Sequence, residues 1–297
     1  MLRLSQAGRR RLAVAAALAA LYLIWGSTYL AMRFAIEGFP PFMMAGTRFL
    51  LAGGMLYVFL RLRGAAAPGR GEWAGSIMVG GFLLLGGNGG VAYAEQWVAS
   101  GVAALAVATV PLWTVLFAGW RERHWPDRQE WAGIVLGFAG VALLSLGANM
   151  QTSAAGAAVL LFSTLSWAFG SVWSRGLSLP PGLMGSAAQM LGGGALLMAA
   201  SLMLGEEMTA APSVKAVLAW GYLVVFGSFV AFSSYLYLLQ TVRPAVATSY
   251  AYVNPVIAVV LGAALGGERF TPVEGAAMAV ILAAVGLVMV KRPGRRA

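Results

Sequence analysis

Residues 122–126 read ERHWP, and residues 268–272 read ERFTP. The chain has 297 residues and only 10 Asp and Glu, so a Glu-Arg-x-x-Pro repeated at an interval of 146 positions needs an explanation. Three explanations compete: chance, a pair of catalytic carboxylates, or one helix junction present in two copies of a duplicated architecture. The rest of the sequence discriminates among them.

The composition indicates a membrane protein. The chain is 60% hydrophobic and 10% charged, whereas a soluble domain has about 25% charged residues. Apolar runs of about 20 residues recur along it, and each can cross a bilayer core of about 30 Å. Backbone groups in lipid must be satisfied internally, which allows only helices or closed barrels. The runs are continuous rather than alternating, so we predict an all-α polytopic membrane protein.

The apolar runs predict ten transmembrane helices, separated by Gly- and Pro-containing connectors. The predicted spans are 12–34, 41–61, 73–94, 99–120, 130–148, 152–174, 182–204, 214–239, 245–266 and 273–291.

The basic residues predict the orientation. Arg and Lys gather at both termini and in alternate connectors, as in RRR at 9–11, RER at 121–123 and KR at 291–292. Cytoplasmic loops carry the excess of Lys and Arg, so both termini are predicted to be cytoplasmic, which requires an even number of spans. The same rule accounts for the net charge of +10 without a nucleic-acid partner.

Other residues recur in the same order as the ERxxP pair. YAEQWV at 93–98 corresponds to YLLQTV at 237–242, and Pro111 corresponds to Pro255, both at an offset of 144. The ordered series predicts a duplication of five spans, and an odd number of spans places the two copies upside down relative to each other. Inverted repeats are typical of secondary transporters, whose site lies near the midplane between them. The predicted units are residues 1–148 and 149–297.

WGSTYLAMR at 25–33, Arg48, and a proline, a glutamate and a Gly-rich helix in each half resemble the EamA family of the drug/metabolite transporter (DMT) superfamily. The resemblance covers essentially the whole chain, and within the family it is greatest to YddG-type exporters of aromatic and other amino acids. It implies ten helices and the export or exchange of small metabolites.

Aromatic and amide side chains within the spans are the candidate substrate contacts. An apolar cavity with a few placed polar groups is typical of small-ligand sites. The alternatives are interface anchors for the aromatic residues and interhelical hydrogen bonds for the amides. The candidates are Trp25, Tyr29, Asn88, Tyr93, Trp113, Trp167, Tyr237, Tyr252 and Asn254.

Arg48 is a charge roughly 10 Å inside its span, at about 1.5 Å per residue. Intramembrane charges are functional candidates whose partner should be named, and the available carboxylates are Glu95 and Glu37. A structural ion pair, an outer gate and a contact for a substrate carboxylate all remain open. Glu95 is also the candidate proton carrier.

Pro111 and Pro255 are candidate gate residues. A proline inside a helix frees the carbonyl four residues earlier, here at Val107 and Ala251, and bends the helix. A packing kink is the alternative, since membrane helices tolerate proline.

Glu122 and Glu268 are predicted on opposite faces, roughly a membrane thickness apart, whereas a catalytic carboxylate pair needs a separation below about 10 Å. We therefore expect each glutamate to cap the following, Pro-started helix or to anchor a gate.

These observations predict an inner-membrane secondary transporter that exports small metabolites, above all aromatic or hydrophobic amino acids, by alternating access. A multidrug efflux carrier for lipophilic compounds is the alternative. A membrane-embedded enzyme would need clustered acids, histidines or metal ligands, and the sequence has no Cys, a single His124 and no Walker-type P-loop. We expect no enzyme activity, cofactor, metal or nucleic-acid partner. Membrane lipids and a small molecule are the expected partners, and a monomer is compatible with the pattern.

Overall fold

The computed structural model describes residues 6–97, 103, 106–123, 125–145, 154–266 and 272–289, and this part of the chain is helical throughout, with turns and connectors between the helices. Six helical runs within it are long and apolar enough to cross a membrane: Gly8–Ile36, Pro41–Leu62, Arg70–Ala94, Ala154–Gly176, Leu183–Met203 and Val214–Thr241. The other four predicted spans contain helices α7 (Val110–Glu122), α8 (Arg128–Ser145), α14 (Tyr250–Gly266) and α15 (Pro272–Met289).

Three of the six runs contain a π-helical segment. The first comprises α1 (Gln6–Ala20), the π-helical η1 (Leu21–Trp25) and α2 (Gly26–Ile36). The third comprises α4 (Arg70–Gly80), η2 (Gly81–Gly89) and α5 (Gly90–Ala94), and the eighth predicted span comprises α11 (Val214–Tyr222), η4 (Leu223–Phe232) and α12 (Ser233–Thr241). The π-helices η2 and η4 occupy matching positions in spans that the predicted duplication makes equivalent. π-Helix is rare and frequently occurs at functional sites, so we expect the functional site at the centre of the bundle, beside these segments.

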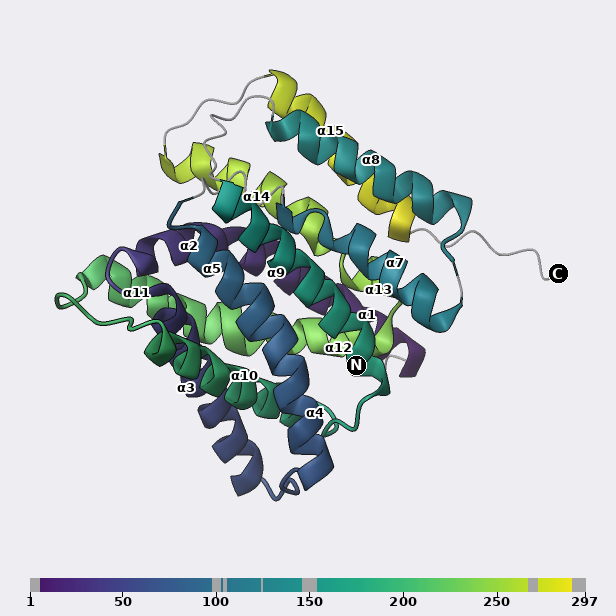
Figure 1. The fold of residues 1–297 in the computed structure, drawn as a ribbon. Coiled ribbons are helices and arrows are strands. Elements are labelled where there is room, and N and C mark those ends of the chain that lie inside the picture. Colours follow the sequence, from purple (N-terminus) through teal and green to yellow (C-terminus); the bar gives the residue numbers. More distant parts are fainter. Residues whose placement is uncertain are drawn as a thin grey trace, which may run out of the picture.

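Close helix pairs hold the bundle together. Helix α3 (Pro41–Leu62) packs along α10 (Leu183–Met203), and α15 packs along α8 at a distance from α3 and α10 (Figure 1). A Cβ atom at Gly53 of α3 would lie 2.8 Å from the Met190 Cβ and 3.0 Å from the Leu191 nitrogen. Only glycine therefore permits this approach, as in small-residue interfaces of membrane helices.

The two predicted proline positions differ in the structure. Pro255 lies inside α14, as predicted. Pro111 does not lie in the middle of a helix, because a turn at residues 108–109 interrupts the span and α7 begins at Val110. In the first turn of a helix the missing proline N–H leaves no hydrogen bond broken, so the turn, rather than a proline kink, interrupts this span.

The expectation that Glu122 caps the next helix is wrong. Glu122 ends α7, and Asp127 instead caps α8 by accepting the Glu130 N–H at 2.8 Å. The Glu122 Oε1 lies 3.8 Å from the Arg175 Nη1. The equivalent Glu268 lies outside the described residues.

The face of the bundle at which α1 begins and α7, α9 (Ala154–Trp173) and α12 end is rich in arginine, and we refer to it as the arginine-rich face. Helices α1 and α12 lie side by side there (Figure 1). Besides the Arg175–Glu122 pair, four side-chain contacts of arginine lie there, and three of them join residues before 148 to residues after it. The contacts are Arg10 to the Thr241 carbonyl (3.1 Å), Arg121 to the Val172 carbonyl (2.7 Å), Arg175 to the Val242 carbonyl (2.7 Å) and Arg243 to the Glu130 carboxylate.

Candidate substrate cavity

A central cavity lies where the first, third, fourth, sixth, eighth and ninth predicted spans meet, together with α3 of the second. It encloses about 670 Å³ of space between atoms, including space continuous with solvent. Its principal side chains are Trp25, Thr28, Tyr29, Arg48, Phe49, Asn88, Trp167, Phe232, Tyr250 and Asn254.

Arg48 supplies the positive charge of the cavity wall. Its side chain is 2% exposed, one guanidinium N–H donates to the Asn88 Oδ1, and its Nε has no hydrogen-bond partner. Among the described residues, no carboxylate lies within 4.0 Å of it. A buried charge without a counterion is strongly unfavourable, so this wall is prepared for an anion.

Neither predicted carboxylate is a direct partner of Arg48. Glu37 forms an ion pair with Lys215 on the surface, because it follows the end of α2 and points away from the cavity. Glu95 acts on Arg48 electrostatically, yet it does not line the cavity, and both of its carboxylate oxygens are buried without a hydrogen-bond partner in the described chain.

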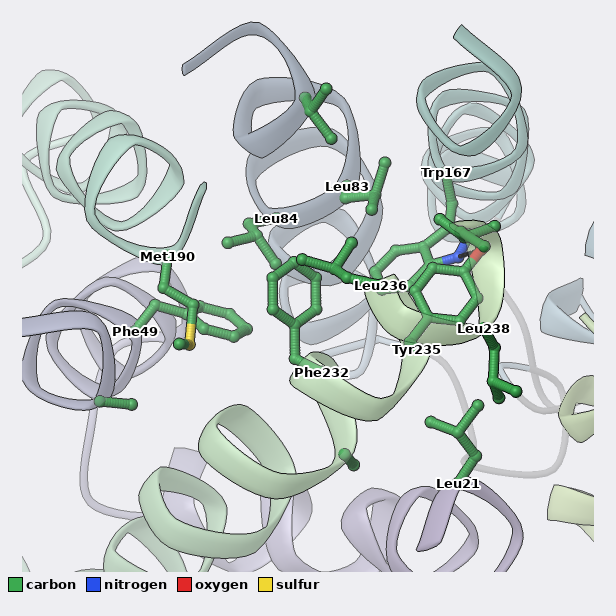
Figure 2. Packing of buried hydrophobic residues seen from close by; sticks show 14 of the residues in the cluster. Leu21, Phe49, Leu83, Leu84, Trp167, Met190, Phe232, Tyr235, Leu236 and Leu238 are labelled. Carbon is green, nitrogen blue, oxygen red and sulfur yellow. Dashed lines mark hydrogen bonds between the residues drawn. The ribbon is translucent and has the colours of Figure 1, made fainter. Parts of the chain in front are cut away.

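Trp25, Trp167 and Tyr250 line the cavity, and Tyr235 packs against all three rings from outside the lining; we name these four residues the aromatic cluster. The Trp25 ring centroid lies 5.5 Å from that of Trp167, 5.3 Å from Tyr235 and 4.7 Å from Tyr250. Trp167 donates its indole N–H to the Tyr235 hydroxyl at 3.0 Å, and the two side chains point toward each other (Figure 2). Edge-to-face ring pairs and this hydrogen bond fix the wall.

The cluster lies toward the arginine-rich face. Trp167 and Tyr235 each stand six residues before the last residue of their helices, α9 and α12, which end on that face. Arg48 lies closer to the opposite face of the bundle, because it is in the first half of α3, which begins at that face with Pro41. The cavity is therefore polarised, with aromatic rings at one end and a positive charge toward the other.

Asn254 adds an acceptor to the cavity wall. Its side chain is 1% exposed, and its Oδ1 has no hydrogen-bond partner within the described residues. Buried polar atoms normally find partners, so this oxygen is suited to a ligand donor. The cavity thus presents an unsatisfied cationic donor, an unsatisfied acceptor and aromatic surface.

Five of the nine predicted substrate contacts line this cavity. They are Trp25, Tyr29, Asn88, Trp167 and Asn254. Arg48, predicted as a gating or structural residue, lines it too. Tyr250 was not singled out as a contact, although it precedes Asn254 by one helical turn and so shares its face.

The other four predicted contacts lie elsewhere. Tyr93 lines a separate, apolar groove, and Trp113 donates its indole N–H to the side chain of Thr109 one turn earlier. Tyr237 is 37% exposed, while the Tyr252 ring packs against α8, where a Cβ at Gly137 would approach it to 3.0 Å. Their positions on the helices point these side chains away from the cavity. Glu95, Pro111, Glu122 and Pro255 do not line it either, although Pro111 and Pro255 adjoin lining residues.

The apolar helices and the cavity that they surround are those of a helical membrane protein. The EamA-like transporter family matches the chain twice, over residues 12–146 and 154–290. The chain belongs to this family and is a membrane transporter, which confirms the predicted family membership.

Relatives in several organisms resemble most of the chain. The "Uncharacterized inner membrane transporter YedA" of Escherichia coli (strain K12) is 48% identical over 284 residues, which cover 94% of this chain and 92% of the relative. The "Uncharacterized transporter YdfC" of Bacillus subtilis (strain 168) is 26% identical over 246 residues, covering 80% and 78%. A crystal structure of another protein has a TM-score of 0.76 at 20% identity, covering 93% of this chain and 97% of that one, and thus shares the fold. The chain is a multi-pass protein of the inner membrane.

Proposed function

We propose that this transporter exports small aromatic or hydrophobic amino acids across the inner membrane by alternating access, as YddG-type exporters do. In this proposal the chain has ten transmembrane helices, arranged as two inverted five-helix repeats at residues 1–148 and 149–297. Both termini and the arginine-rich face are cytoplasmic. The observation that carries the proposed substrate class is Arg48, a buried cation at the cavity wall without a carboxylate partner in the described chain.

A zwitterionic amino acid matches the unsatisfied groups of the cavity. Its carboxylate supplies the acceptor that the Arg48 guanidinium lacks, in a charge-assisted hydrogen bond. Its ammonium group supplies a donor for the Asn254 Oδ1. An apolar side chain then lies against the aromatic cluster, where burial of its surface contributes roughly 25 cal/mol per Å².

A multidrug carrier for lipophilic cations fits this cavity less well. A cationic drug would meet Arg48 of the same charge, and like charges in a site of low dielectric repel strongly. The aromatic walls alone would suit such a ligand, so the charge of the wall decides between the two substrate classes.

Reconstituted protein tests the proposal. Proteoliposomes are loaded with radiolabelled L-phenylalanine, L-leucine or tetraphenylphosphonium, and efflux is compared with that from empty liposomes. We expect efflux of both amino acids and none of the cation. Efflux of tetraphenylphosphonium without efflux of either amino acid would overturn the proposal and favour the multidrug carrier.

A further inference from the structure

A second cavity lies at the arginine-rich face, between the 3-10 segment Ser174–Gly176 that follows α9, the connector at 177–181, α10 and α12. It encloses about 650 Å³ of space, including space open to solvent, and shares no lining residue with the central cavity. Six of its ten lining residues are leucine or proline. Its polar residues are Ser174, Arg175, Gln189 and Gln240.

Gln189 is the buried polar group of this second cavity. Its side chain is 2% exposed, and its Oε1 has no hydrogen-bond partner in the described chain. A buried amide oxygen without a donor is unusual and leaves its desolvation uncompensated. A ligand N–H group entering the cavity would supply the donor.

Arg175 is the cation that lines the second cavity. One of its Nη atoms donates to the Val242 carbonyl at 2.7 Å, and the other lies 3.8 Å from the Glu122 carboxylate. A guanidinium carries five N–H donors, so these two contacts leave donors for a ligand. The cavity therefore offers a cationic donor and an unsatisfied acceptor, the same combination as the central cavity.

We propose that the second cavity is a loading site, which binds the amino acid before it passes the aromatic cluster. The carboxylate binds Arg175, the ammonium group donates to the Gln189 Oε1, and the apolar side chain lies against the leucines. This inference rests on the proposed amino-acid export and on the arginine-rich face being the side from which substrate is taken.

Adjacent residues and hydrogen bonds connect the lining of this site to the aromatic cluster. Leu236, which lines the second cavity, follows Tyr235 of the aromatic cluster directly. The Tyr235 hydroxyl lies 2.7 Å from the Ser171 Oγ, and the Ser171 carbonyl accepts a hydrogen bond from Ser174, another lining residue. In this proposal the aromatic cluster is the barrier between the two cavities.

Transport in vesicles of known orientation tests the loading site. The half-saturating concentration of L-phenylalanine is measured separately for substrate supplied at the arginine-rich face and at the opposite face. We expect Arg175→Gln and Gln189→Leu to raise it about tenfold at the arginine-rich face, since each removes a hydrogen bond to a charged group. The value at the opposite face should change less than twofold.

Gln240 permits a milder perturbation, because this residue is exposed and lines the same cavity. Gln240→Glu adds a negative charge that repels the carboxylate, so it should raise the half-saturating concentration at the arginine-rich face. The control Arg61→Gln removes a charge from an exposed helix end outside both cavities and should have no effect.

Competition with partial substrates separates the two ends of the ligand. We expect Arg175→Gln to weaken inhibition by 3-phenylpropionate, which has only the carboxylate, and to leave inhibition by phenethylamine unchanged. Gln189→Leu should do the reverse. The same loss for both inhibitors in each variant would overturn the assignment of the two groups.

The loading site and the proposed function can fail separately. If wild-type protein transports no L-phenylalanine or L-leucine, the proposed function fails. If wild-type protein transports them while Arg175→Gln and Gln240→Glu keep wild-type values at both faces, only the loading site is overturned. Equal changes at both faces would also overturn it, because they would indicate a general loss of the fold or of the transport cycle.

Discussion

Replacing Arg48 with methionine should weaken substrate binding without destabilising the ligand-free protein. Methionine is apolar, unbranched and shorter, so it fills most of the space of a residue that is 2% exposed. If Arg48 were important for packing, its replacement would lower both the substrate affinity and the stability of the ligand-free protein. The two effects are expected to separate here because the charge lacks a carboxylate partner among the described residues.

The magnitude of the binding loss follows from the hydrogen bonds between Arg48 and the substrate carboxylate. Hydrogen bonds to charged groups contribute about 1.5–3 kcal/mol, which corresponds to an increase of about 10- to 150-fold in the Kd. The measurement is calorimetric titration of the purified protein with L-phenylalanine. Phenethylamine, which lacks the carboxylate, should bind both proteins equally and serves as the matched control.

The Arg48→Met substitution has two opposing effects on the stability of the ligand-free protein. Removing the guanidinium relieves the desolvation penalty of an unpaired buried ion, which is several kcal/mol. It also deprives the Asn88 Oδ1 of its donor, which costs about 1–3 kcal/mol. The thermal midpoint should therefore stay the same or rise, and rise further when Asn88→Leu removes the unsatisfied oxygen as well.

A large fall in stability would refute this reasoning. Breaking a buried ion pair costs about 3–5 kcal/mol, so a loss of that size in Arg48→Met would mean that a carboxylate compensates the charge after all. Glu95, which acts on Arg48 electrostatically, would then be its structural partner, and the carboxylate-binding role would be lost.

Three further predictions concern other parts of the molecule. Gly53→Ala should lower the thermal midpoint, because its Cβ would lie 2.8 Å from a neighbouring Cβ atom, whereas Gly54→Ala meets nothing within 4 Å and should raise stability by about 0.5–1 kcal/mol. Trp167→Ala should raise the half-saturating concentration of L-phenylalanine more than that of L-alanine in flux assays, and equal effects would contradict the aromatic wall. Asp127→Ala should lower the free energy of unfolding by about 1 kcal/mol, because it removes a helix cap, and Glu122→Ala should lower it by less than half as much. Thermal melts of both variants measure the two changes.

The family and the central contacts could be predicted because hydropathy and residue type determine them locally. Runs of apolar residues gave the positions of the helices, and deep aromatic and amide residues identified Trp25, Trp167, Asn88 and Asn254 as lining residues. The choice between Tyr235 and Tyr237 illustrates the limit of this approach. The sequence repeat pairs Tyr237 with Tyr93, and this pairing favoured Tyr237. Side chains two residues apart on a helix point about 200° apart, and Tyr235 is the one that packs against Trp25 and Trp167.

The partner of Arg48 could not be predicted for a related reason. Asn88 lies in η2, where π-helical winding replaces the α-helical period. Each π-helical turn takes in more residues than an α-turn, so the face on which a residue lies no longer follows from regular spacing. A charge was expected to pair with a charge, and the carboxylates predicted near the same membrane face were considered first. The amide that receives the Arg48 N–H becomes visible only once the two helices are placed together.

Arg175 connects the opening sequence motif to the proposed loading site. The same guanidinium lies 3.8 Å from Glu122 of ERHWP and lines the second cavity. A substrate carboxylate at Arg175 therefore competes with the Glu122 carboxylate, and by linkage the contact must weaken substrate binding as much as substrate binding weakens the contact. If the contact holds α7 against the end of α9, occupation of the loading site loosens the arginine-rich face next to the aromatic cluster. Glu122→Gln should then lower the half-saturating concentration of L-phenylalanine at that face, and an increase would show that Glu122 positions Arg175 for the ligand instead of competing with it.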